Sequence, residues 1–130
     1  MEKSRVLIID DEKDFLMLAK LNLEQSGKYE VRVLSSAKEM LDLVHAFKPD
    51  VILMDLVMPN IGGLEACEML NNDSLGKVIP IIVLSGLDKT VDKVKAYKLG
   101  IEDYLTKPID SILLSEKIER VLQLKRDEEC

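Results

Sequence analysis

The chain has 130 residues, of which 47% are hydrophobic and 32% are charged, and its formal net charge is −6. This length and composition predict one globular domain whose core needs no disulfides, and the acidic balance argues against direct binding to nucleic acid. The apolar runs are too short to cross a membrane, no signal peptide is expected, and the two cysteines lack metal-ligand spacing. These features favour a cytoplasmic protein that does not bind membranes.

Strand and helix patterns alternate five times along the chain. In chain order we expect strand 5–9, helix 12–26, strand 29–34, helix 37–47, strand 51–54, helix 64–71, strand 81–84, helix 88–99, strand 101–105 and a last helix that begins at Pro108. Five such units imply an α/β fold in which a parallel sheet carries helices on both faces. The charged segment 125–130 is expected to be a solvated helix end or the start of a connection, which leaves 5–124 as the folded core.

Apolar spacing also predicts which face of each helix is buried. On the first helix the inward residues are Phe15, Leu18, Ala19 and Leu23. On the last helix they are Ile112, Leu113 or Ile118, Val121 and Leu122. Ser36 is expected to cap the second helix, because a serine hydroxyl accepts hydrogen bonds from the first helical amides.

Aspartates follow two of the predicted buried strands directly. The first strand ends at Asp10 and Asp11, and the third ends at Asp55. The ligand crevice of a parallel sheet lies beyond the carboxyl ends of its strands, so these carboxylates converge if the two strands are neighbours. Like charges held that close usually bind a cation, which predicts a divalent metal and chemistry on a carboxylate. The alternative for each aspartate alone is a helix cap or a turn residue.

Further residues stand in order at the ends of the later strands. Met58-Pro59 and Gly63 follow the third strand, Ser85 follows the fourth, and Lys107-Pro108 follows the fifth. Together with the aspartates, they make the whole chain resemble the receiver domain of a two-component response regulator. The resemblance implies a flavodoxin-like (βα)5 sandwich with strand order 2-1-3-4-5, a cis peptide bond between Lys107 and Pro108, and one receiver domain over 1–130.

The resemblance also implies roles for individual residues. Asp55 would accept a phosphoryl group. Mg²⁺, for which Mn²⁺ can substitute, would be bound directly by Asp11, Asp55 and the backbone carbonyl of Val57, and by Asp10 mainly through bound water. Lys107 and Ser85 would contact phosphoryl oxygens. Ser85 and Tyr104 would form the switch that responds to them. Glu12 could add a carboxylate, although a solvated side chain is the simpler interpretation.

The function implied is a phosphorylation-dependent switch rather than a metabolic enzyme. The resemblance also implies that the phosphodonor histidine belongs to a partner, either a sensor histidine kinase or a histidine phosphotransfer protein. His45, the only histidine, is expected to lie on the surface away from the crevice. The surface around the fourth helix, fifth strand and fifth helix would then control a partner, an attached output domain or a homodimer. Val57 and Leu87 are apolar, which predicts slow hydrolysis of the aspartyl phosphate.

Two other classes of protein compete with this interpretation. A phosphatase of the haloacid dehalogenase type also places a nucleophilic aspartate after a parallel strand, but it needs a second acid two residues later, where this chain has Val57. A binding module that has lost phosphorylation is the third possibility. The full set of acids together with Ser85 and Lys107 counts against it.

Overall fold

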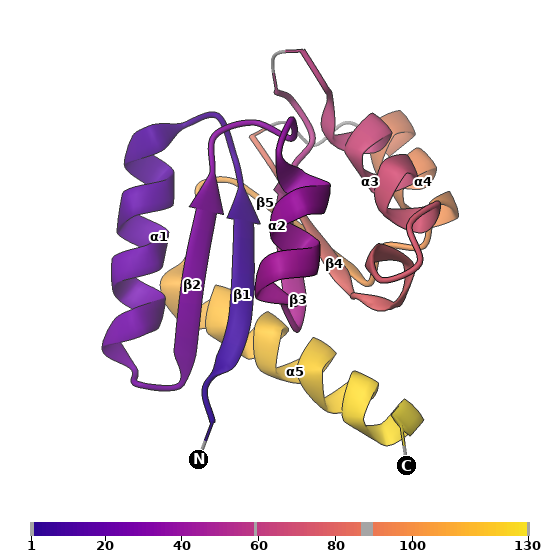
Figure 1. The fold of residues 1–130 in the computed structure, drawn as a ribbon. Helices are drawn as coiled ribbons and strands as arrows, with labels where there is room; N and C mark the ends of the chain where they lie inside the picture. The colour runs from indigo at the N-terminus through magenta and orange to yellow at the C-terminus, as the bar shows by residue number, and fades with distance from the viewer. Residues whose placement is uncertain (1, 59, 87–89, 130) are drawn as a thin grey trace.

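The computed structural model describes residues 2–58, 60–86 and 90–129 (Figure 1). Its elements are β1 (Ser4–Ile9), α1 (Lys13–Gln25), β2 (Tyr29–Leu34), α2 (Met40–Phe47), β3 (Val51–Asp55), α3 (Gly63–Asn71), a short 3-10 turn (Gly76–Val78), β4 (Ile81–Ser85), α4 (Thr90–Lys98), β5 (Asp103–Thr106) and α5 (Ser111–Glu129). The strands form one parallel sheet in the order β2-β1-β3-β4-β5. The predicted α/β fold and strand order are confirmed.

Both faces of the sheet are buried, and successive residues of each strand alternate between them. On β1, Leu7 and Ile9 pack in one core and Val6 and Ile8 in the other. The helices α2, α3 and α4 cover the first core, and α1 and α5 cover the second (Figure 1). Continuous apolar runs such as 6–9 are therefore required, because every side chain of a central strand is enclosed.

Two helices begin later than the sequence predicts, for local reasons. The helix α2 starts at Met40 rather than at 37, and Ser36 does not cap it. The Ser36 hydroxyl instead accepts the Lys38 amide, at 3.4 Å, within a turn. The helix α5 starts at Ser111 rather than at Pro108, because an Asp110 carboxylate oxygen accepts the Ile112 amide at 3.0 Å and so caps it.

The buried stripes of two helices also differ from the prediction. Leu18 is 59% exposed, and Leu16 is buried in its place. Since 15–19 is apolar throughout, spacing alone does not choose between stripes. On α5, Ile112 and Leu113 are exposed, whereas the predicted Ile118, Val121 and Leu122 are buried.

The remaining strand and helix ends shift by a residue or two. The strands β3 and β4 extend by one residue to Asp55 and Ser85, and β5 begins at Asp103 rather than at Ile101. Of the predicted fourth helix, 88 and 89 lie outside the described residues, and 90–98 is helical. The charged segment after Leu124 continues α5 as far as Glu129, which fits the expectation of a solvated helix end.

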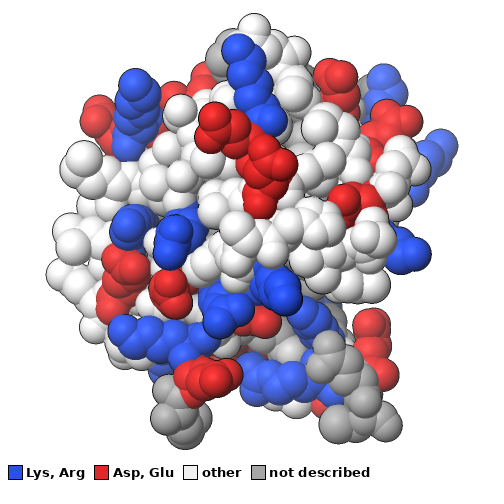
Figure 2. Space-filling model, viewed as in Figure 1, with Lys and Arg blue, Asp and Glu red and all other residues white. Residues whose placement is uncertain are grey.

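The charge is unevenly distributed over the surface. Figure 2 shows Lys and Arg side chains gathering on the lower part of the face seen in Figure 1, where β1 and β2 begin and α5 crosses beneath them. The carboxylates that the sequence singles out lie at the opposite edge of the sheet, where the strands end.

Candidate functional site

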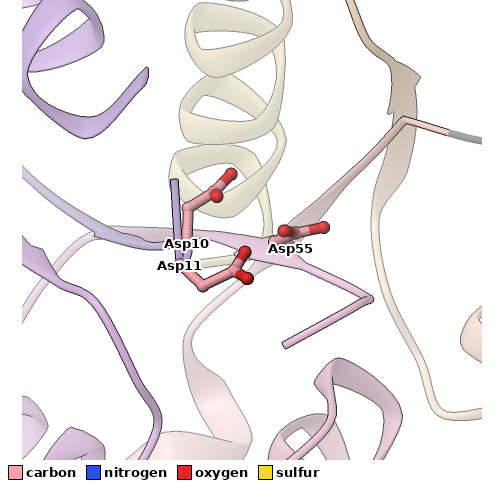
Figure 3. Close-up of side chains that lie close together, drawn as sticks. All are labelled: Asp10, Asp11 and Asp55. Atoms are coloured by element: carbon pink, nitrogen blue, oxygen red, sulfur yellow. The ribbon is translucent and has the colours of Figure 1, made fainter. Parts of the chain in front are cut away.

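The site lies at the carboxyl edge of the sheet, beyond β1 and β3. These strands are paired with Ile9 opposite Met54, so Asp10, which follows β1, and Asp55, which ends β3, lie side by side. Carboxylate oxygens of Asp10, Asp11 and Asp55 lie within 4.8 Å of one another (Figure 3). Asp10 and Asp55 are buried, and Asp11 is exposed. The predicted convergence of these side chains is present.

Asp10 shapes the turn that leads into α1. One of its carboxylate oxygens accepts the Glu12 amide at 2.8 Å, while its own amide donates to the Leu34 carbonyl at 3.1 Å. Glu12 occupies the cap position of α1, where no side chain accepts a helical amide. Asp10 therefore makes an aspartate turn before the helix, and its second oxygen remains directed at the site.

The loop after Asp55 is closed by Gly63. The Gly63 amide donates to the Leu56 carbonyl at 2.9 Å, and the Val57 amide donates to an Asp55 carboxylate oxygen at 3.3 Å. A Cβ at Gly63 would lie 2.3 Å from the Asp55 carbonyl oxygen, so only glycine fits where α3 begins. Met58 is buried, and Pro59 lies outside the described residues.

Lys107 brings a positive charge to the acids from the end of β5. Its ammonium nitrogen lies 2.6 Å from Asp10, 3.0 Å from Glu12 and 3.8 Å from Asp55, measured to the nearest carboxylate oxygen. It also lies 4.6 Å from the centre of the Phe15 ring. Burial alone would lower the pKa of Lys107, but the hydrogen bonds to Asp10 and Glu12 and the negative charge around it raise that pKa above its usual value.

The acids outnumber the cation that faces them. Burial raises the pKa of Asp55 to about 7, the charge of Asp10 adds to this effect, and Lys107 opposes it. Ionisation of Asp55 therefore costs free energy unless a further positive charge binds nearby. Closely grouped carboxylate oxygens with a surplus of negative charge are the donor set that suits a hard divalent cation such as Mg²⁺.

Ser85 and Tyr104 lie on the neighbouring strands β4 and β5, where Ser85 pairs with Thr106 and Val83 with Tyr104. Both side chains are buried, and the Lys93 ammonium lies 5.4 Å from the centre of the Tyr104 ring. The Lys107 amide donates to the Ser85 carbonyl, at 2.6 Å, and the Lys107-Pro108 peptide bond is cis, as expected. Val57 is 60% exposed beside the site, whereas Leu87 lies outside the described residues.

Sequence reasoning missed two contributors to the surroundings of Lys107. Glu12 is solvated and Phe15 packs against the core, as the sequence favoured, but both also contact the lysine. Their separation by three residues at the start of a helix puts them on one face, which is the signal that could have paired them. His45 is exposed, as expected, and contacts an Asp73 carboxylate oxygen at 2.9 Å.

An apolar groove of about 1090 Å³ runs between α1 and α5 and reaches Lys107. Phe15, Leu18, Ile109 and Ile112 are among the residues that line it. Within the described ranges, no helix has the length and apolar character needed to cross a membrane.

Comparison with known proteins finds one family along almost the whole chain. Residues 6–119 match the response regulator receiver domain family. Protein PilH of Pseudomonas aeruginosa is 36% identical over 119 residues, which cover 92% of this chain and 98% of PilH. A response regulator receiver domain protein (CheY-like) from Methanospirillum hungatei JF-1 has a solved structure with a TM-score of 0.90 and 28% identity, covering 98% of this chain and 99% of that one.

Some relatives are about twice as long as this chain. The alkaline phosphatase synthesis transcriptional regulatory protein PhoP of Bacillus subtilis (strain 168) is 34% identical over 119 residues, which cover 92% of this chain but only 48% of PhoP. The chain thus spans about half the length of the longer curated relatives that it matches.

Proposed function

Because this chain belongs to the response regulator receiver domain family, we propose that it is a phosphorylation-dependent signalling switch whose phosphoryl acceptor is Asp55. The observation that carries the proposal is the buried Asp55 carboxylate, which lies beside Asp10 and Asp11 and 3.8 Å from the Lys107 ammonium. We propose that 1–130 acts as one receiver domain with its core at 5–124, and that it acts in the cytoplasm.

In the proposed reaction an Asp55 carboxylate oxygen attacks the phosphorus of a donor. The new oxygen–phosphorus bond makes an acyl phosphate, and the donor's bond to phosphorus breaks with its electron pair leaving on the donor. The donor is a phosphohistidine of a sensor histidine kinase or of a histidine phosphotransfer protein. The domain catalyses only its own modification and the slow reversal of it.

The residues around Asp55 would stabilise the transferred group. The Lys107 ammonium and the Ser85 hydroxyl donate hydrogen bonds to phosphoryl oxygens. We propose that Asp10, Asp11, Asp55 and the Val57 carbonyl hold Mg²⁺, for which Mn²⁺ can substitute. When bound, the cation neutralises the carboxylates and the incoming phosphoryl oxygens.

The output follows from a two-state change near the acceptor. Ser85 and Tyr104 are buried on adjacent strands, so a move of Ser85 toward a phosphoryl group alters the packing available to the ring. The surface of α4, β5 and α5 then changes its affinity for a partner, an attached output domain or a second copy of the chain. Direct binding to nucleic acid is not part of the proposal, given the net charge of −6.

Acetyl phosphate and beryllofluoride test the two halves of this proposal. Intact-mass measurement should find one phosphoryl group added by acetyl phosphate with Mg²⁺ and none in EDTA. NMR amide shifts on adding beryllofluoride should spread to β5 and α4, and shifts confined to the neighbours of Asp55 would contradict the switch. Full phosphorylation in EDTA would contradict the metal site.

A long lifetime of the aspartyl phosphate belongs to the same proposal. The exposed Val57 side chain flanks the site and offers no hydrogen bond to an attacking water. Val57→Asn together with Leu87→Glu should speed decay of the phosphoprotein about tenfold or more, which is about 1.4 kcal/mol of barrier. A decay time course with the same rate in both proteins would rule this role out.

The competing phosphatase function is disfavoured at the same residue. A haloacid dehalogenase-type mechanism places a general acid two residues after the nucleophile, and that position is Val57. Release of phosphate from a phosphomonoester substrate, catalysed over many turnovers, would favour the phosphatase instead.

A further inference from the structure

We propose that Glu12 and Phe15 are positioning residues for Lys107, which hold its ammonium on the α1 side of the site until a phosphoryl oxygen replaces Glu12 as its partner. The inference rests on the proposed function, because it concerns what Lys107 does before and after Asp55 is phosphorylated. It assigns a role to the first turn of α1, which the proposed reaction does not otherwise use.

The ammonium is held from several directions, but not by the nucleophile. Among the described residues, the carboxylates within 4.0 Å of the Lys107 nitrogen are those of Asp10, Glu12 and Asp55. Asp10 and Glu12 accept hydrogen bonds at 2.6 Å and 3.0 Å, whereas Asp55 lies at 3.8 Å, beyond hydrogen-bond distance. The Phe15 ring supports the ammonium at 4.6 Å.

An ammonium has three hydrogens, so the two bonds to Asp10 and Glu12 leave one for the reaction. The Asp55 oxygens are consequently paired with the lysine electrostatically, while Asp10 and Glu12 accept two of the three ammonium hydrogens. This keeps the nucleophile available. It also means that Lys107 must exchange a partner to donate more than one hydrogen bond to a phosphoryl group.

Glu12 is the partner that can be exchanged. The Asp10 side chain is fully buried, whereas the Glu12 side chain is 63% exposed. An ion pair with an exposed partner contributes little, and a phosphoryl oxygen is a stronger acceptor than a solvated carboxylate. Arrival of the phosphoryl group therefore moves Lys107 away from Glu12 and from the Phe15 ring, and frees the start of α1.

Two substitutions near the start of α1 distinguish the effect of the contact with Lys107 from the effect of negative charge alone. Glu12→Asp keeps the charge but is one methylene too short to reach Lys107. Asp14→Asn removes a charge from the same turn, where the exposed Asp14 is not among the carboxylates close to Lys107. Since both positions are exposed, both variants are expected to fold.

The first test measures the rate of phosphorylation by acetyl phosphate against donor concentration, with Mg²⁺. We expect Glu12→Asp to raise the limiting rate about threefold, since an exposed ion pair opposes release by no more than that order. Asp14→Asn should leave the limiting rate unchanged. A wild-type rate in Glu12→Asp, or an equal rise in Asp14→Asn, would overturn the positioning role.

The second test observes the lysine without any phosphoryl transfer. Methylene protons of Lys107 should show an upfield ring-current shift that is lost in Phe15→Leu and on adding beryllofluoride with Mg²⁺. An unchanged shift in Phe15→Leu would overturn the contact, and an unchanged shift with bound beryllofluoride would overturn its release. A wild-type chain that takes up no phosphoryl group would contradict the proposed function instead. The Phe15→Leu comparison would still show whether the Phe15 ring contacts Lys107.

Discussion

Asp55 and Asp103 are both buried aspartates on strands of one sheet, but the charges around them are balanced in opposite ways. Asp55, at the end of β3, shares one ammonium with Asp10 and Glu12. Asp103, at the start of β5, has two cations nearby, Lys117 at 3.0 Å and Arg120 at 3.6 Å.

The difference distinguishes the proposed site of phosphorylation from an ion pair that stabilises the fold. Around Asp55, burial raises the pKa of the carboxyl to about 7, and the negative charge of Asp10 adds to this effect. Around Asp103 the carboxylate is compensated within the chain, and its other oxygen accepts the Tyr104 amide at 2.8 Å. A carboxylate left short of positive charge can gain a cation, whereas a compensated one only ties β5 to α5.

The largest expected effect is on covalent modification. Asp55→Asn should abolish phosphorylation by acetyl phosphate, because an amide is not a nucleophile of this kind, while Asp103→Asn should be modified at about the wild-type rate. Intact-mass spectra of both variants and the wild type measure this. A phosphoryl adduct that persists in Asp55→Asn would contradict the assignment of Asp55 as the acceptor.

The next effect is on binding of Mg²⁺. Asp11→Asn should weaken Mg²⁺ affinity by about tenfold or more, since it removes one of few charged oxygen ligands. Asp103→Asn is the matched control, because it removes an equal charge at the opposite edge of the sheet. Isothermal titration calorimetry measures the Mg²⁺ affinity of both variants. An equal loss of affinity in the two would mean that the net charge of the protein, rather than direct coordination by Asp11, determines Mg²⁺ binding.

A third effect concerns pH in the metal-free protein. Because the pKa of Asp55 is about 7 in the folded chain and about 4 when unfolded, the folded state binds the proton more tightly between these values. The free energy of unfolding should therefore fall as pH rises from about 4 to 7, by about 3 kcal/mol from this group.

Asp55→Asn lacks that titration, so the wild-type stability relative to this variant should decrease over the same window. Urea unfolding in EDTA at a series of pH values measures the difference. A pH-independent difference would mean that the pKa of Asp55 is not raised in the folded protein.

The smallest effect is expected at the compensated aspartate. Asp103→Asn should destabilise the fold by about 1 kcal/mol, because Lys117 and Arg120 are partly exposed and exposed ion pairs contribute little. The amide oxygen can still accept the Tyr104 amide. Chemical denaturation checks the value, and a loss several times larger would assign Asp103 a greater structural weight than its contacts indicate.

Much of this architecture could be predicted from the sequence, because buried parallel strands require uninterrupted apolar runs. The strand order and the cis peptide bond came from the family resemblance rather than from periodicity. Local patterns were least informative where they were degenerate: 15–19 is apolar throughout, so it did not distinguish Leu16 from Leu18.

The acids of the site could also be predicted, since Asp10, Asp11 and Asp55 directly follow their strands. The contacts of Lys107 could not, because Glu12 and Phe15 precede it by more than ninety residues and meet it only through the fold. Their spacing of three residues could pair Glu12 and Phe15 with each other, but no local pattern pairs them with Lys107.

The close approach at Gly63 has a mechanical consequence for Asp55, the proposed acceptor. A contact between two side chains can absorb a displacement by changing rotamer, but where α3 begins, backbone lies directly against the backbone of Asp55 and Leu56. Nothing there can yield without moving the chain itself. A force that displaces the start of α3 is therefore transmitted to the main chain that carries the Asp55 carboxylate, and work done on that carboxylate is transmitted back to α3.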